Sequence, residues 1–122
     1  MTIVEAIQSM LTDSGITCVY IIDCPVKGDA VLITPYMTTP YDGVPIGEQR
    51  FQIYCASSKY VDSENLAWRV LRAVDGKSVP ACDREILTPV NAIQEPFYLD
   101  KDAQGRYLHS FNIAVSAVWK GE

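Results

Sequence analysis

The chain of 122 residues has a globular and acidic composition: 48% of the residues are hydrophobic, 20% are charged, and the formal net charge at pH 7 is -5. At this length one domain, residues 1–122, with a single hydrophobic core is the natural expectation. No apolar run reaches the roughly 20 residues that span a bilayer, and no Lys/Arg cluster offers the footprint of phosphate binding. We therefore exclude a membrane span and a tightly bound nucleic acid. Because the N-terminus lacks the basic leader of a secretory signal, we expect a cytoplasmic protein.

The first predicted helix begins at the N-terminus. Thr2 can cap it, and Glu5 three residues later completes a capping-box pattern. Its apolar residues fall on one face: Ile3, Ile7, Met10 and Leu11. The turn-forming residues 13–15 end the helix.

Two apolar, β-branched runs follow at residues 17–23 (TCVYIID) and 30–36 (AVLITPY). Good turn chemistry at residues 27–29 (KGD) predicts that they form a hairpin. The next segment, residues 34–48 (TPYMTTPYDGVPIGE), is either a long projecting loop or an extended hairpin with Asp42 and Gly43 in its turn. Its apolar side chains are candidates to contact a partner: Tyr36, Met37, Tyr41, Val44 and Ile46.

A half-buried strand and a second helix occupy the middle of the chain. Residues 50–56 alternate between apolar and polar side chains, as in a strand with one face buried. For the helix that follows, we expect Asp62 as the cap, Val61 and Leu66 as a hydrophobic staple, and Gly76 as the stop.

The outward face of this second helix carries an unusual set of side chains. With about 100° of rotation per residue, Trp68, Arg69 and Arg72 lie opposite the apolar stripe. Tryptophan and arginine are enriched at protein interfaces. The alternative is that Trp68 lies over its own domain or stacks on Arg72.

The last third of the chain predicts a strand at residues 85–92 and the longest strand at residues 107–119; residues 98–99 offer the start of another strand, and residues 100–105 form the turn into the longest one. The predicted order is α-β-β-β-α-β-β. We expect an α+β fold: a mixed, mainly antiparallel sheet with two helices packed on one face and a fairly polar opposite face.

Candidate catalytic and metal-binding groups are few. The four cysteines (Cys18, Cys24, Cys55 and Cys82) form no CxxC pair, which favours buried free thiols over a metal site or a disulfide. His109 is the single histidine, and a Cys55/His109 pair leaves open a small hydrolase. Residues 100–105 begin like a calcium loop, but Phe111 stands at the twelfth position, where a Glu is needed. We expect no catalytic set, cofactor or metal.

The opening helix, the early strands with their long loop, and three later stretches resemble the small tail terminator and minor capsid proteins of long-tailed bacteriophages. The three later stretches are FQIYCAS (51–57), YVDSENLAWRVLRAVDG (60–76) and YLDKDAQGRYLHSFNIAVSAVW (98–119).

The resemblance implies a structural virion protein, not an enzyme, assembled in the host cytoplasm. It implies a homo-oligomeric ring, typically a hexamer, at the head-proximal end of the tail tube. Such a ring would end tail polymerisation and join the tail to a head connector or stopper protein. DNA would pass through it without specific binding. A head-completion or stopper ring of the same neck is the alternative.

Overall fold

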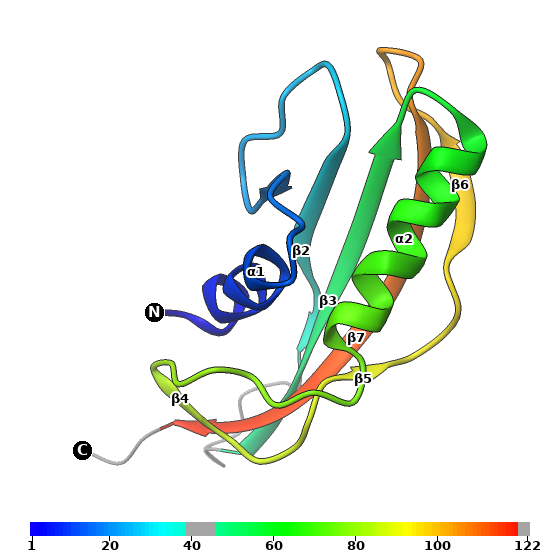
Figure 1. Ribbon diagram of the computed structural model, residues 1–122. Helices are drawn as coiled ribbons and strands as arrows, with labels where there is room; N and C mark the ends of the chain where they lie inside the picture. Colours follow the sequence, from blue (N-terminus) through cyan, green and yellow to red (C-terminus); the bar gives the residue numbers. More distant parts are fainter. Residues whose placement is uncertain (39–45, 120–122) are drawn as a thin grey trace.

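Two helices pack on one face of a seven-stranded sheet in the computed structural model, which describes residues 1–38 and 46–119 (Figure 1). The helices and strands are, in chain order, α1 (Ile3–Asp13), β1 (Val19–Tyr20), β2 (Ala30–Thr38), β3 (Ile46–Ser57), α2 (Tyr60–Val74), β4 (Arg84–Ile86), β5 (Asn91–Ala92), β6 (Phe97–Lys101) and β7 (Tyr107–Trp119). The α+β class predicted from the sequence is confirmed.

The two longest strands form the spine of the sheet. β3 and β7 pair antiparallel from Ile46↔Val118 to Ser57↔Tyr107. β2 pairs with the other side of β3, and β1 lies at the edge beyond β2. The opposite edge consists of β4, β5 and β6, which all pair antiparallel with successive parts of β7.

The capping box predicted at the start of α1 is present. The Thr2 backbone N–H donates to Glu5 Oε1 at 2.9 Å, and the Glu5 N–H donates to Thr2 Oγ1 at 3.3 Å. These bonds satisfy two backbone groups that lack partners within the helix. The helix ends at Asp13, and Gly15 adopts a φ of +88°, which glycine accepts at little cost.

The core lies between the two helices and the sheet. Its fully buried side chains come from α1, α2, β2, β3 and β7, and include Ile7, Leu11, Ile33, Ile53, Val70, Val74, Phe111 and Ile113. The alternation predicted for β3 and β7 is confirmed, because their odd-numbered residues from 51 to 55 and from 109 to 117 are buried. Each large apolar side chain contributes about 1.5–3 kcal/mol when it is fully buried.

The predicted hairpin between β1 and β2 is wrong. The two strands pair in parallel, with Val19↔Val31 and Tyr20↔Leu32, so residues 21–29 carry the chain back along the sheet. A distant contact favours this path: the buried Arg106 guanidinium donates to the carbonyl oxygens of Pro25 (2.9 Å) and Gly28 (3.2 Å). Turn chemistry within residues 27–29 does not show this contact.

Helix α2 begins earlier than predicted. Its N-cap is Lys59, which makes no side-chain capping bond, and Asp62 lies in the first turn. Val61 is 62% exposed, so it forms no hydrophobic staple. Tertiary contacts set the start instead, because the buried Ser63 hydroxyl donates to the Cys55 carbonyl at 2.9 Å and the Tyr60 ring packs against a buried histidine. The predicted stop holds: α2 ends at Val74, and Gly76 has a φ of +74°.

The strand predicted at residues 85–92 is divided into β4 and β5. Between them, the Leu87 N–H still donates to the Ser116 carbonyl, and the Ser116 N–H donates to Thr88 Oγ1 at 2.9 Å. Pro89 has no N–H to continue this ladder. The segment therefore follows β7 throughout but forms two short strands.

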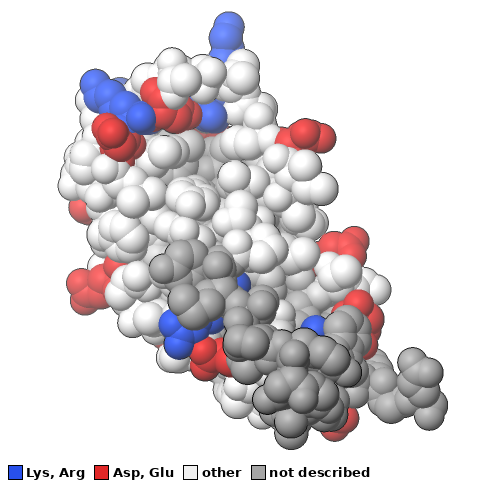
Figure 2. Space-filling view, turned by 180° about the vertical axis from the view of Figure 1, so that it is seen from behind, with Lys and Arg blue, Asp and Glu red and all other residues white. Residues whose placement is uncertain are grey.

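Among the described residues, no helix or strand covers the face of the sheet opposite the two helices, and polar side chains lie at the centre of this face. The Gln52 amide donates to Ser110 Oγ at 3.0 Å, and the Ser110 hydroxyl donates to the Ile53 carbonyl at 2.9 Å. Figure 2 shows that the area of this face just above the grey atoms is free of charged side chains, and that Lys, Arg, Asp and Glu side chains lie around it.

Candidate assembly interface

The described parts of the segment at residues 34–48, which are residues 34–38 and 46–48, continue two strands. β2 runs to Thr38, which pairs with Gln49 after a bulge between Pro35 and Met37, and β3 begins at Ile46, which pairs with Val118. The backbone of Tyr36 and Met37 therefore lies in β2 and that of Ile46 in β3. The other two candidates, Tyr41 and Val44, lie outside the described residues. The extended hairpin is the alternative that fits these strands.

The candidate face on α2 includes the stacking contact that the sequence left open. The Arg72 guanidinium carbon lies 5.5 Å from the centre of the Trp68 ring, within the range of a cation–π contact. Trp68 is half-buried, whereas Arg69 and Arg72 are exposed. The contact orders Trp68 and still leaves both arginines available to a partner, so the interface role stays a prediction.

The candidate face on α2 and the ends of β2 and β3 lie in different parts of the molecule. β2 ends and β3 begins at the lower end of the sheet in Figure 1, whereas α2 covers its middle and upper part. The sequence-derived residues therefore belong to two separate surfaces.

The single histidine lies in the core, beneath an aromatic cluster. His109 is 1% exposed, and its ring centre is 4.7 Å from that of Tyr60 and 5.6 Å from that of Tyr98. The Ser63 hydroxyl gives its hydrogen to the Cys55 carbonyl, so Nδ1 of His109 carries the proton that donates to Ser63 Oγ, 2.9 Å away. Burial lowers the pKa of His109, a shift that the Glu64 carboxylate partly opposes. The imidazole is therefore neutral at pH 7.

The arrangement of Cys55 and His109 does not favour nucleophilic chemistry. They are directly opposed in the β3–β7 ladder, and Cys55 is 0% exposed. Burial raises the pKa of the Cys55 thiol far above its ordinary value, whereas a nucleophile must be a thiolate. Both side chains are therefore placed as core residues.

The four cysteines are free thiols; Cys55 and Cys82 are buried, as expected, whereas Cys18 and Cys24 are only partly buried. Within residues 1–38 and 46–119, no group of three or more His, Cys, Asp or Glu side chains is placed to hold a metal ion. Over the same residues, neither helix is long and apolar enough to cross a bilayer.

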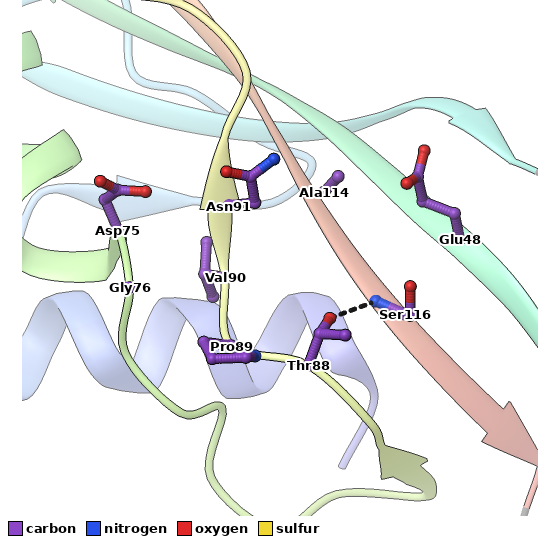
Figure 3. A pocket seen from close by; sticks show the side chains of 9 residues that line it. All are labelled: Glu48, Asp75, Gly76, Thr88, Pro89, Val90, Asn91, Ala114 and Ser116. Carbon is purple, nitrogen blue, oxygen red and sulfur yellow. Dashed lines mark hydrogen bonds between the residues drawn. The ribbon is translucent and has the colours of Figure 1, made fainter.

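A cleft of about 400 Å³ opens beside β5 and the lower part of β7. Figure 3 shows its two carboxylates, Asp75 and Glu48, at opposite ends. Each is engaged: Asp75 Oδ1 accepts from the Ala92 N–H at 2.9 Å, and Glu48 pairs with Arg50 at 2.6 Å. Both carboxylates of the cleft are therefore held by partners in the structure.

Sequence reasoning missed Arg106. It lies beyond the β6–β7 turn, where its Nε donates to Asp102 Oδ2 at 2.7 Å and its guanidinium reaches the loop at residues 21–29. Burial alone would raise the pKa of Asp102, but the hydrogen bonds and positive charge of Arg106 outweigh it and lower this pKa. No local signal could have revealed the residue, because its loop partners are 78 and 81 positions away.

Comparison with known proteins identifies a family. The sequence model of the family described as "Bacteriophage tail terminator protein" matches residues 3–119, which include both helices and the whole sheet. A search of the curated proteins finds no significant match.

Among solved structures, the chain is similar to one from a "Virion of native gene transfer agent (GTA) particle". The TM-score is 0.70, and the alignment covers 95% of this chain and 91% of that chain at 11% sequence identity. At this identity the likeness shows a shared fold.

Proposed function

Because the chain belongs to the bacteriophage tail terminator family, a family of structural tail proteins, we propose that it ends polymerisation of the tail tube. It does so as a ring, a hexamer, on the head-proximal end of the tube, and the ring joins the tail to the head connector or stopper protein. The observation that carries the proposal is the family match across residues 3–119.

Ring formation requires contacts that close by rotation. Such contacts join two different surfaces of the same subunit, so each copy must present both. The Trp68, Arg69 and Arg72 face and the arm at residues 34–48 are our candidate contact elements, towards neighbouring copies, the tube or the connector. The prolines of the arm restrict its backbone, which reduces the entropy lost on docking.

We propose that the protein is not an enzyme and that DNA passes through its ring unspecifically. Support for the first point comes from the buried Cys55 and His109 and the raised thiol pKa. The net charge of -5 supports the second, since an acidic wall repels phosphate. On this proposal, assembly takes place in the host cytoplasm and the ring becomes part of the virion.

The experiment is to inspect, by electron microscopy, particles produced without this protein. A tail terminator predicts tubes of uncontrolled, excessive length. Tails of normal length that are not attached to heads would instead assign the chain to a head-completion or stopper ring. Restoration by a Cys55→Ala variant that folds and assembles would show that no thiol chemistry is needed.

A further inference from the structure

Exposed large hydrophobic side chains gather at the two lateral edges of the sheet. One group, the loop patch, consists of Ile22 and Val26 in the connection between β1 and β2; they are 83% and 58% exposed. The other, the β6 patch, lies on β6 and at the start of α2 and consists of Tyr60, Val61, Phe97, Tyr98 and Leu99, which are 37% to 62% exposed. Exposed large apolar side chains that gather at an edge are candidates for interaction sites.

The loop patch is presented on a fixed backbone. The Arg106 guanidinium holds the carbonyls of Pro25 and Gly28, and Asp102 in turn holds the guanidinium. The Ser57 hydroxyl adds a bond to Asp29 Oδ1 at 2.8 Å. An element whose backbone is already fixed loses little entropy on binding, so these contacts suit a docking role.

The β6 patch combines an aromatic cluster with an open strand edge. The ring centres of Tyr60 and Tyr98 are 5.2 Å apart, and Tyr107 packs against both. Among the described strands, β6 pairs with β7 only. The other edge of β6 therefore offers unpaired backbone groups. Tyrosine anchors and a free strand edge are both recurring features of protein contacts.

The two patches have the placement that a head-to-tail contact needs. Figure 1 shows the connection between β1 and β2 on one side of the sheet and β6 on the other, at a similar height along the long strands. One patch is aliphatic and the other mainly aromatic, so they are unlike surfaces. A stable contact buries about 800 Å² per partner, and two such contacts would take roughly a quarter of the accessible surface of 6831 Å².

We propose that the loop patch of one copy packs against the β6 patch of the next copy, so that repetition closes the ring. This inference rests on the proposed ring and names its subunit contact. It places the contact outside the arm and the Trp68 face, which stay available to the tube and the connector.

The test uses two variants of the full chain, Ile22→Asp in the loop patch and Leu99→Asp in the β6 patch. Each introduces a charge that must be buried unpaired in the contact, and each should weaken self-association at least 100-fold, giving monomers of 13.6 kDa in light scattering. An equimolar mixture of the two should form dimers, because one intact loop patch can still meet one intact β6 patch.

Leu87→Asp is the matched control, since Leu87 is exposed but lies beyond β4 and outside both patches. It should keep the wild-type mass. If Leu99→Asp fails to fold by circular dichroism, Val61→Asp replaces it, because a carboxylate is favourable in the first turn of a helix.

The inference is overturned if either variant keeps the wild-type mass, or if the mixture of folded variants stays monomeric. It is also overturned if the variants form rings but no longer bind the tail tube. In that case the two patches would contact the tube and not a neighbouring copy. A wild-type chain that never self-associates would overturn both this contact and the ring, whereas the tail-length experiment addresses termination separately.

Discussion

Replacing Arg106 by Met should destabilise the protein far more than replacing an exposed arginine. The guanidinium binds the Asp102 carboxylate at 2.7 Å and two backbone carbonyls, and the Arg106 side chain is 10% exposed. The net contribution of one hydrogen bond to the free energy of unfolding is about 1 kcal/mol, and about 1.5–3 kcal/mol when one partner is charged. The Met variant also leaves two carbonyls and a mostly buried carboxylate without this partner. We expect a loss of about 3–5 kcal/mol.

Urea unfolding followed by circular dichroism measures this loss, with Arg72→Met as the control. Arg72 is exposed and stacks on Trp68, a contact that contributes about 0.5–1 kcal/mol. If Arg106→Met costs no more than Arg72→Met, Arg106 does not hold the loop at residues 21–29.

The pH dependence gives a second check on the same contact. Asp102 has a lowered pKa in the folded state, so its pairing adds stability above the ordinary carboxyl pKa of about 3.9. This stability is lost as the pH falls through the lower folded-state value. The difference in unfolding free energy between wild type and Arg106→Met should therefore shrink in acid; a constant difference would contradict the ion pair.

Three further predictions concern other parts of the chain. The pKa of His109 is lowered by burial, so the unfolded state takes up its proton first, and stability should fall as the pH drops below about 6.5; an equal fall in His109→Gln, measured by urea unfolding, would assign the effect to other groups. Thr2→Ala removes the side-chain cap of α1 and should cost about 1 kcal/mol; an unchanged urea midpoint would show that the cap is dispensable. Replacing residues 39–45 by a short turn should preserve thermal unfolding while weakening assembly in light scattering, and an unfolded variant would place the segment in the core.

Local and periodic patterns predicted the parts of the fold that local interactions determine. The capping box of α1 lies within four residues, and the buried residues of β3 and β7 follow a period of two along one strand. These patterns give the class of fold and the order of its long elements.

The errors occur where distant residues decide the structure. Arg106 turns the loop at residues 21–29 back along the sheet, and Ser63 and Tyr60 begin α2 before the Asp62 cap that the sequence offers. In both cases tertiary contacts override a good local signal.

The candidate interface was predictable in part. Trp68 stands out because a large aromatic side chain occurs on the outward face of a helix. Ile22 and Leu99, in contrast, belong to runs that resemble strand interiors, and their exposure follows from the parallel β1–β2 pairing and from the edge position of β6. Sequence alone does not reveal which strand lies at an edge.

The most direct test of the central claim is to measure tube length while purified tail tube protein polymerises with and without this chain. We predict that the chain, added during elongation, stops growth at shorter lengths and forms a ring at one end of each tube in electron micrographs. An unchanged length distribution, with tube ends that carry no additional density, would contradict the assignment as a terminator.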